Sequence, residues 1–449
     1  NNTAKTPEEN SLKSSQLNNQ NPSEEEHQDT SEGEESQSLE TSPITNQDSA
    51  SSHVAIFRSI AASSSQSNSE NIPNADGSPS AGGDVGSSSQ PSTPGSDSSI
   101  NHVIGGGAIY GEAVKIENLS GYGTFSNNNA VDHQISGSTS DVLGGAIYAK
   151  TSLTIDSGNS SGTITFSENT ASSKSTTGQV AGGAIFSPSV TITTPVTFSK
   201  NSAINATTSS KKDTFGGAIG AISTVSLSKG ARFSENIADL GSAIGLVPTT
   251  QDAETVQLTT GSYYFEKNKA LKRATVYAPI VSIKAHTATF DQNISAEEGS
   301  AIYFTKEATI ESLGSVLFTG NLVTPIQSTT VLTSGNTSKY GAAIFGQIAN
   351  ASGSQTDNLP LKLIASGGNI SFRNNEYRPD ATNTGQSTFC SIAGDIKLTM
   401  QAAEGKVISF FDAIRTSTKK TGTLASAYDT LDINKSNDSG SINSAFTGT

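Results

Sequence analysis

Short runs of alternating apolar and polar residues recur along the chain, and most of them end at Gly, Ser or Asn. The 25 residues from Gly216 to Leu240 contain three such runs, at 216–221, 224–228 and 231–236. Alternation over four to six residues between turn residues predicts short β-strands joined by tight turns. The sequence nowhere sustains the i, i+3, i+4, i+7 apolar spacing of an amphipathic helix. The pattern therefore predicts an all-β chain.

Two motifs organise these runs and recur together eight times between Gly106 and Asn375. A Gly-Gly-Ala-Ile motif, or a close variant, opens each copy, and a Phe-x-x-Asn motif follows it. One such unit at a period of roughly 25 to 40 residues indicates a stacked solenoid rather than a closed globule. Because each unit holds three strand-like runs, we expect a right-handed parallel β-helix with three short strands per coil.

Both motifs supply residues that we expect to hold successive coils together. The four complete glycine motifs consist of Gly106, Gly107, Ala108, Ile109, Gly144, Gly145, Ala146, Ile147, Gly182, Gly183, Ala184, Ile185, Gly216, Gly217, Ala218 and Ile219. The eight Phe-x-x-Asn motifs contribute Phe125, Asn128, Phe166, Asn169, Phe198, Asn201, Phe233, Asn236, Phe265, Asn268, Phe290, Asn293, Phe318, Asn321, Phe372 and Asn375. In the sixth copy, Arg273-Ala274-Thr275-Val276 stands in for the glycine motif and keeps only its aliphatic residue.

Stacking assigns a physical role to each motif position. The fourth residue of the glycine motif is Ile or Val in every copy, so we expect it to form an interior aliphatic column, with the phenylalanines as a second column. The paired glycines suit a sharp corner. The Asn residue tolerates a left-handed backbone, and stacked Asn amides can hydrogen-bond from coil to coil.

The residue after the aliphatic position should point the opposite way by strand alternation. It is, in order, Tyr110, Tyr148, Phe186, Gly220, Gly245, Tyr277, Tyr303 and Phe345. We expect these side chains to face outward, where size is less restricted. Two interpretations stay open here: a recognition stripe, or packing against a covering loop.

The segment between Phe-x-x-Asn and the next glycine motif varies most in length. It is short in copies four to six, as in the link Ile237–Leu240, and long in copies one to three and seven. The long segments are polar and include 171–180, 202–215 and 322–340. Insertions at one corner of a solenoid often mark its binding face. We therefore expect recognition there, and we expect deletion of 171–180 and 202–215 to leave the fold intact.

Composition changes sharply near residue 100. The first 100 residues hold 15 acidic residues, 3 basic residues and one aromatic residue, Phe57, which gives a net charge of −12 out of −14 for the chain. Such a segment buries too little apolar surface to offset the entropy of ordering, so we expect residues 1–100 to be a disordered acidic tail. Val54–Phe57 is the only candidate there for local order. Residues 101–449 are assigned to the β-helix.

The remaining residues are almost neutral, with 26 acidic and 24 basic side chains by subtraction, so nucleic-acid binding finds no electrostatic support. The single cysteine, Cys390, is expected to be a buried thiol. The sequence opens without Met or a signal peptide and ends at Thr449 without a polar cap. We therefore expect a fragment of a longer precursor, with a solenoid that is cut at its C-terminal end.

Catalytic and metal-binding patterns are weak. Glu168 and Glu235 share a position that other copies fill with Asn, Lys or Gln, so we interpret them as solvated turn residues rather than a carboxylate cluster. The five histidines share no metal-ligand spacing, and we expect neither metal nor cofactor.

The densest basic cluster of the solenoid is a candidate contact for a glycosaminoglycan or another anionic surface. It consists of Lys267, Lys269, Lys272 and Arg273. A solvated corner is the simpler interpretation of the same residues.

The repeated Gly-Gly-Ala-Ile and Phe-x-x-Asn motifs resemble those of the chlamydial polymorphic membrane proteins over residues 106–375. The stretch 398–414, with Gly405-Lys406-Val407-Ile408-Ser409-Phe410-Phe411-Asp412, is similar to the segment that follows the repeats in that family. The resemblance implies an autotransporter adhesin whose passenger domain is displayed on the bacterial surface for attachment to host cells. It also implies membrane attachment through a C-terminal β-barrel, which we expect to lie outside this sequence.

Our leading hypothesis is a non-enzymatic surface adhesin that binds a host cell-surface receptor or a glycosaminoglycan. A second is a self-associating structural or antigenic surface protein, because an open end of a solenoid presents unpaired strand edges. A polysaccharide-cleaving β-helix enzyme is a third.

Overall fold

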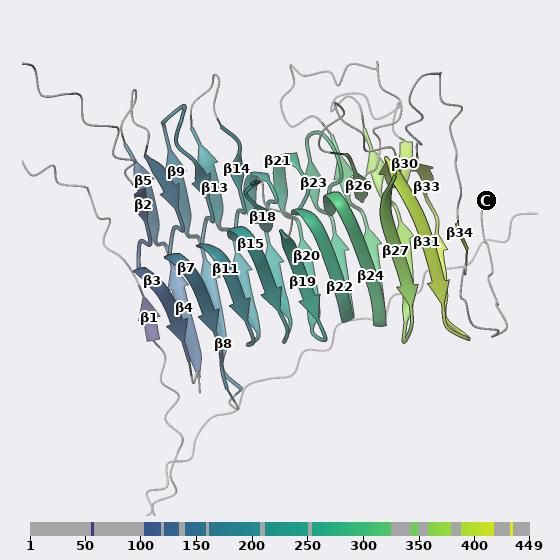
Figure 1. Cartoon of the computed structure of the whole chain (residues 1–449), viewed down its shortest axis with the longest axis horizontal. Helices are drawn as coiled ribbons and strands as arrows, with labels where there is room; N and C mark the ends of the chain where they lie inside the picture. The colour runs from purple at the N-terminus through teal and green to yellow at the C-terminus, as the bar shows by residue number, and fades with distance from the viewer. Residues whose placement is uncertain are drawn as a thin grey trace, which may run out of the picture. The chain divides into compact units, whose positions relative to one another are not determined.

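The computed structural model describes residues 55–57, 103–117, 121–133, 140–158, 161–206, 212–249, 254–324, 343–348, 358–378, 388–416 and 432–433. All of them belong to one of two compact units, Ser51–Thr449. Every regular element in these ranges is a β-strand, and Figure 1 shows the strands stacked in coils that follow one another from blue to yellow. The predicted parallel β-solenoid is confirmed.

Successive coils contribute strands in the same order. Before the first coil lie β1 (Ala55–Phe57) and β2 (Val103–Gly105). Coils one to three contain β3 (Ile109–Ile116), β4 (Tyr122–Ser126), β5 (Asn129–Asp132) and β6 (Asp141–Leu143); β7 (Ile147–Ile155), β8 (Thr163–Ser167), β9 (Thr170–Ser173) and β10 (Val180–Ala181); and β11 (Ile185–Ile192), β12 (Val196–Ser199), β13 (Ser202–Asn205) and β14 (Thr214–Phe215).

The later coils keep this order with fewer breaks. Coils four to seven contain β15 (Ile219–Leu227), β16 (Ala231–Ser234) and β17 (Ile237–Leu240); β18 (Ile244–Leu246), β19 (Thr255–Thr259), β20 (Ser262–Glu266) and β21 (Lys269–Arg273); β22 (Val276–Asp291) and β23 (Ile294–Ser295); and β24 (Ile302–Thr319) and β25 (Leu322–Val323). The remaining strands are β26 (Ile344–Gly346), β27 (Leu359–Ala365), β28 (Asn369–Arg373), β29 (Glu376–Tyr377), β30 (Thr388–Gly394), β31 (Ile396–Ala402), β32 (Ile408–Phe410), β33 (Ala413–Thr416) and β34 (Asp432–Ile433). The predicted continuation of the coil past the eighth motif pair is confirmed.

The coil has three faces. The long face is formed by strands that begin at the aliphatic motif residue, such as β3, β7, β11 and β15. The phenylalanine face is formed by β4, β8, β12, β16 and their successors. The insert face is formed by the strands between each Asn and the next glycine motif, such as β9, β13 and β17. Strands β22 and β24 run through both the long and the phenylalanine faces, with one register shift within the long face, between Ala278 and Ile280, and one where the faces meet, between Ala285 and Thr287.

Two strand boundaries differ from the prediction. The predicted runs 216–221 and 224–228 join into the single strand β15, because a bulge opposite β11 keeps the pairing continuous. The link Ile237–Leu240 is instead the third strand of its coil, β17, which pairs with β13, β14 and β21. Three strands per coil is therefore correct, but the inserts interrupt the third strand rather than a turn.

The two predicted interior columns are confirmed. The aliphatic residues pair in register from Ile109 to Ile344, and Ile392 and Ile414 extend their column. Nine phenylalanine rings, from Phe125 to Phe410, stack with centroids 4.5–5.0 Å apart and planes within 10° of parallel. Both columns fill one continuous core.

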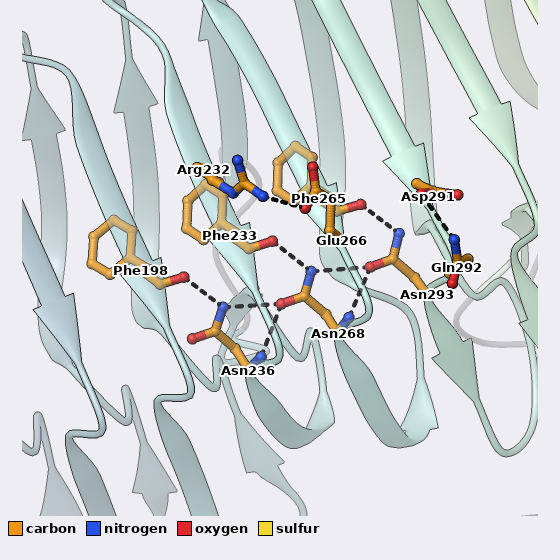
Figure 2. A network of polar contacts seen from close by, with 10 residues as sticks. All are labelled: Phe198, Arg232, Phe233, Asn236, Phe265, Glu266, Asn268, Asp291, Gln292 and Asn293. Atoms are coloured by element: carbon orange, nitrogen blue, oxygen red, sulfur yellow. Dashed lines mark hydrogen bonds and ion pairs between the residues drawn. The ribbon is translucent and has the colours of Figure 1, made fainter. Parts of the chain in front are cut away.

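The motif asparagines form a fully buried, hydrogen-bonded column, and Figure 2 shows its middle section. From Asn128 to Asn321, each Nδ2 donates to Oδ1 of the Asn in the next coil at 2.9–3.0 Å. From Asn169 to Asn375, each Nδ2 also donates to the carbonyl oxygen of the Phe in the preceding coil at 2.9–3.1 Å. The predicted coil-to-coil amide bonding is confirmed.

The left-handed backbone at this corner lies one residue earlier than predicted. The residue before each Asn has a φ between 53° and 62°, and these residues are Asn127, Glu168, Lys200, Glu235, Lys267, Gln292, Gly320 and Asn374. The corner is thus made by an exposed residue in most coils, which leaves the Asn free to direct its amide inward. Glu168 and Glu235 are indeed exposed turn residues.

Asp412 ends the asparagine column. Its Oδ2 accepts hydrogen bonds from N and Nδ2 of Asn375 and from Oγ of Ser391, all at 2.9 Å. Its Oδ1 accepts one from N of Asn374 at 2.9 Å. Because every amide in the column points its donor toward the next coil, the carboxylate meets the positive end of an aligned row of dipoles.

The paired glycines make the corner between the insert and long faces. In the four complete motifs the first glycine has a φ of 65–70°, which favours glycine. The second glycine lies against the next coil: a Cβ on Gly217 would lie 2.2 Å from the carbonyl oxygen of Ser242 and 2.6 Å from that of Ile237. The predicted glycine corner is confirmed.

Substitution Gly217→Ala is expected to lower the free energy of unfolding by roughly 1–3 kcal/mol, because two backbone strands must move apart to admit the methyl group. Urea unfolding followed by circular dichroism measures the change. Gly111→Ala is the control, because there the nearest atom to a new Cβ is the end of the Val114 side chain at 3.1 Å. Equal losses in the two variants would contradict close approach as the reason for the second glycine.

The sixth copy forms this corner with one residue fewer. Ala274, rather than Arg273, takes the left-handed conformation, with a φ of 54°. Ala274 is two residues before Val276, whereas the equivalent Gly299 of the next copy is three residues before Ile302. Arg273 therefore belongs to the end of the insert face rather than to the corner.

The residues after the aliphatic position pair in register but are mostly buried, contrary to the expected outward stripe. Of the aromatic members, Tyr148, Phe186, Tyr303 and Phe345 are less than 10% exposed, whereas Tyr110 of the first coil is 54% exposed. Tyr148 and Phe186 pack in one apolar cluster with the ends of insert-face strands, at Leu143, Ala181, Phe215 and Leu240, and the half-buried Tyr277 packs against the same cluster. Size is also restricted, because a Cβ on Gly245 would lie 2.4 Å from N of Gly216. The packing interpretation is correct, and the covering element is a strand rather than a loop.

Two smaller predictions concern the tail and the cysteine. Residues 1–54 and 58–102 lie outside the described residues, so disorder of the acidic tail stays a prediction. Ala55–Phe57, in the run expected to have local order, forms β1. Cys390 is a buried thiol, as predicted, and its Sγ lies 3.6 Å from the carbonyl oxygen of Ile392.

Candidate functional site

The candidate site is a surface formed by inserts on the insert face. The inserts of coils one to three leave after β5, β9 and β13 and return at β6, β10 and β14. Residues 174–179, between β9 and β10, are described completely, and the next insert is described up to Ala206 and from Lys212. We call Lys174–Gln179, Asn205–Ala206 and Lys212–Asp213 together the insert surface.

Ser175 organises the loop between β9 and β10. Its backbone N–H donates to Oγ of Ser173 at 2.9 Å, and its own Oγ accepts from N of Thr177 at 3.2 Å and from N of Gly178 at 3.1 Å. Such side chain to backbone bonds stabilise a tight turn. Ser175 is buried, whereas Lys174, Thr176 and Thr177 are exposed.

Hydrogen bonds tie this loop to the coils on both sides. N of Gln179 donates to Oδ1 of Asp141 in the first coil at 2.7 Å, and Nε2 of Gln179 donates to the carbonyl oxygen of Asp213 in the third at 3.0 Å. Nδ2 of Asn205 donates to the carbonyl oxygen of Ser175 at 2.8 Å. The inserts therefore form one connected surface rather than independent loops.

A buried polar pair anchors the third insert where it returns to the solenoid. Oδ2 of the buried Asp239 accepts from N of Thr214 at 3.0 Å, and N of Asp239 donates to Oγ1 of Thr214 at 2.8 Å. Oγ1 of Thr214 in turn donates to the carbonyl oxygen of Ala203 at 2.8 Å, which joins the two ends of the insert. This anchoring limits how far Lys212 and Asp213 can move.

The ends of the inserts are part of the fold, which changes the deletion experiment. Ala171, Val180 and Ala203 are fully buried in a second apolar cluster, and Phe215 packs in a third. Removing 171–180 or 202–215 would therefore delete core residues, so the expectation that the fold stays intact was wrong. Only exposed residues within the inserts are suitable targets.

The predicted basic cluster lies next to this surface, and two of its four residues are paired with acids. Lys272 forms an ion pair with Asp213. Nε of Arg273 lies 3.2 Å from Oε2 of both Glu297 and Glu298. Burial disfavours the charge of Lys272, but the hydrogen bond and charge of Asp213 outweigh it, so the pKa of Lys272 is raised.

The other two residues of the cluster stand apart from these ion pairs. Lys267 is exposed and Lys269 is half-buried on β21. An anion contact at the four-residue cluster remains a prediction, and it would depend mainly on Lys267 and Lys269.

The motif residues predicted as site residues are held inside the solenoid. From Ile147 to Asn375, the aliphatic, phenylalanine and asparagine positions are buried in the described coils. Their contribution to a binding site is therefore to position the inserts. Among the described residues there is no group of three or more His, Cys, Asp or Glu side chains that could hold a metal ion. The described part of the chain contains no helix long and apolar enough to cross a membrane.

Sequence reasoning missed the residues that join the inserts, which are Asp141, Gln179, Asn205 and Asp213. Each is a polar residue in a polar segment, so composition does not distinguish it. Their separations of 38, 34 and 30 residues along the three hydrogen bonds correspond to about one coil. Aligning the inserts on the motifs is the signal that could have revealed these pairs.

Comparison with known proteins identifies the repeat. The family described as the Chlamydia polymorphic membrane protein repeat matches residues 123–150 and 163–188. The chain is 99% identical over its full length to a "Probable outer membrane protein PmpC" of Chlamydia muridarum, of which it covers 31%. It is 69% identical over 82% of its length to the PmpC of Chlamydia trachomatis serovar D, of which it covers 22%.

A third relative has a different name from the first two. The chain is 54% identical over 74% of its length to a "Probable outer membrane protein PmpB" of Chlamydia muridarum, of which it covers 20%. The chain thus spans less than a third of the length of each of these relatives. No solved structure matches it. The repeat match and the near-identity along the whole sequence show that this chain belongs to the chlamydial polymorphic membrane protein family.

Proposed function

We propose that the chain is part of a surface-exposed bacterial adhesin of the autotransporter type, and that its insert surface attaches to host cells. The observation that carries this proposal is the hydrogen-bonded connection of the inserts of three successive coils through Gln179 and Asn205. A surface that is held in place before binding loses less conformational entropy when a partner docks. The buried columns below it keep the coils in register.

The proposed location follows from the relatives. They are named probable outer membrane proteins, and this chain is 99% identical to a part of one of them. We propose the same location for the protein to which this chain belongs, with the solenoid exposed and the membrane attachment in another part. The proposal makes the solenoid a non-enzymatic display scaffold.

The chemistry of the insert surface favours a partner with anionic groups. Lys174 and Lys212 are exposed on neighbouring inserts, and Thr176 and Thr177 offer hydroxyl groups beside Lys174. Exposed lysines attract sulfate, phosphate or carboxylate groups and increase the association rate. A host glycosaminoglycan or an acidic receptor segment has this chemistry.

The double substitution Lys174→Glu with Lys212→Glu is expected to reduce attachment of protein-coated beads to host cells by about tenfold, because two attractive charges become repulsive. Bead counts per cell, with and without added heparin, measure the effect. Circular dichroism and the urea midpoint should stay unchanged, since both side chains are exposed.

The matched control carries the same charge change on the long face. Lys362→Glu with Lys397→Glu alters two exposed lysines on adjacent coils, far from the insert surface along the chain. An equal loss in both double variants would point to a general charge effect and contradict a specific role of the insert surface. Full attachment of the insert variant would also contradict it.

A self-associating surface protein is the second candidate, because a solenoid whose end strands were left uncovered could pair with a second copy through them. Analytical ultracentrifugation separates the two functions. Monomeric protein that still promotes attachment favours adhesion, whereas attachment that appears only with higher oligomers favours the self-associating surface protein.

A further inference from the structure

Two strands of the first coil, β3 and β4, differ in their protection against pairing with another chain. β3, the edge of the long face, has a bulge between Gly111 and Ala113. It also carries Glu112 and Lys115, both of which form ion pairs at the surface. Bulges and charged side chains are the usual features that deter a second chain from adding to a sheet edge.

β4, the edge of the phenylalanine face, has neither feature. Its sequence, Tyr122-Gly123-Thr124-Phe125-Ser126, carries no charge, and its pairing with β8 is regular over all five residues. A regular, uncharged strand that exposes its backbone is a template for another strand. Without a cover, this edge would therefore be open to pairing with a strand of another chain.

Burial shows that this edge is covered. Ile109 and Ile116 on β3 are only partly buried, whereas their partners in the next coil, Ile147 and Ile155, are fully buried. Phe125 on β4, by contrast, is only 1% exposed, almost like its partner Phe166 at 0%. The long face is thus open at the first coil, and the phenylalanine face is closed.

β1 lies along this edge. It pairs in parallel with β4, with Ala55 opposite Gly123, Ile56 opposite Thr124 and Phe57 opposite Phe125. The backbone register gives Phe57 the position that phenylalanine holds in each coil of this face. Phe57 is also the only aromatic residue among the first 100.

We propose that Ala55–Phe57 is a detachable cap on the β4 edge, and that it prevents a second copy of this chain from pairing with that edge. The cap is short, with three backbone pairs, so its attachment is reversible. The 45 residues between Phe57 and Val103 keep it tethered to the solenoid, which favours its return over the arrival of a competitor. The competing strand is the same edge or the same segment of another copy, because it has the matching pattern.

The test uses the full chain with Ile56→Pro, which removes a backbone donor and prevents regular strand geometry at the cap. Ala62→Pro, in the same tail but outside the cap, is the matched control. Hydrogen exchange of the β4 amides that face away from β8 is expected to become at least about tenfold faster in Ile56→Pro and to stay unchanged in Ala62→Pro. Unchanged protection of β12 and β16 shows that the solenoid remains folded. Unchanged exchange in β4 would overturn the cap.

Sedimentation velocity tests the consequence for a second copy. Measurements at about 0.15 M salt reduce the repulsion between acidic tails, which carry a net charge of −12. Ile56→Pro is expected to form larger species as concentration rises, and wild type and Ala62→Pro to remain monomeric. Faster exchange in β4 without association would overturn the assignment of a second copy as the competing partner.

Discussion

Replacing Phe233 with Ala is expected to lower the free energy of unfolding by about 3–5 kcal/mol. Phe233 is fully buried and stacks between Phe198, at 5.0 Å, and Phe265, at 4.9 Å. Removal of the ring takes away stacking on both sides and leaves a gap in the core. The gap cannot close, because backbone pairing of β16 with β12 and β20 fixes the spacing of the coils.

Urea unfolding measures this loss, and Arg232→Ala is the control on the same strand. The Arg232 side chain is 56% exposed and forms a surface ion pair with Glu266, which Figure 2 shows beside the buried column. Surface pairs contribute only about 0–1 kcal/mol, so the control should stay near wild type. Phe233→Leu should be intermediate, since it fills part of the space. Similar losses for Phe233→Ala and Arg232→Ala would contradict the stacked column as a main source of stability.

The location of the effect is a second test of the same column. In a solenoid each coil contacts mainly its neighbours, so the stability of distant coils is only weakly coupled. Hydrogen exchange in Phe233→Ala should therefore increase most in β12, β16 and β20 and much less in β28. Uniform acceleration would show that the stack unfolds as one cooperative unit.

The columns could be predicted from the sequence because the same residue types recur at the same place in each copy. Ile, Phe and Asn sit at fixed motif positions, and stacking brings equal positions together. The strand β17 could not be found this way, because Ile237–Leu240 is short and its buried residues, Ala238, Asp239 and Leu240, do not alternate. The burial of Tyr148 and Phe186 was missed for a related reason: alternation gives the direction of a side chain but not what covers it.

The candidate site was predictable only in outline. Insert length pointed to the insert face, but the bonds that connect the inserts join residues about one coil apart, such as Gln179 and Asp141. The pairing of Lys272 and Arg273 in the basic cluster could not be predicted, because the acids that pair with them are distant or follow later in the chain. Asp213 reaches Lys272 across 59 residues, and Glu298 reaches Arg273 from the next coil. Charge counted along a sequence does not reveal such pairs.

Asn268→Ala is expected to lower the free energy of unfolding by about 3–5 kcal/mol, although it removes only a small amide. Oδ1 of Asn268 accepts from N and Nδ2 of Asn236, and its Nδ2 donates to the carbonyl oxygen of Phe233 and to Oδ1 of Asn293. The substitution breaks all of these bonds and leaves N of Asn236 buried without this acceptor. Unpaired buried groups cost about 1–3 kcal/mol each.

Lys267→Asn is the control, because Lys267 is exposed and left-handed with a φ of 53°, and Asn127 and Asn374 hold the equivalent positions in other coils. It should change stability by less than about 0.5 kcal/mol. Equal effects at 267 and 268 would mean that the column contributes no more than an exposed turn residue.

Asn268→Asp separates hydrogen-bond direction from size. The new carboxyl group could still accept from Asn236, but its second oxygen would face two acceptors, the carbonyl oxygen of Phe233 and Oδ1 of Asn293. Only the protonated form can donate there, so the pKa of the introduced group should be higher in the folded than in the unfolded state. The folded state then binds the extra proton, and the variant should lose stability relative to wild type as the pH rises from about 4 toward 7.

Asp412, the native carboxylate at the end of the column, can be compared with the carboxyl group introduced at position 268. Asp412 receives donors on both oxygens, and in the described part of the chain neither oxygen has to donate to a further Asn, so a group that only accepts hydrogen bonds fits this position. Urea unfolding midpoints of Asn268→Asp and wild type, measured at several pH values, test the expected loss of stability with rising pH. A variant as stable as wild type at neutral pH would show that the column tolerates a carboxylate in its middle, and that the uniform direction of its amides is not what holds the coils together.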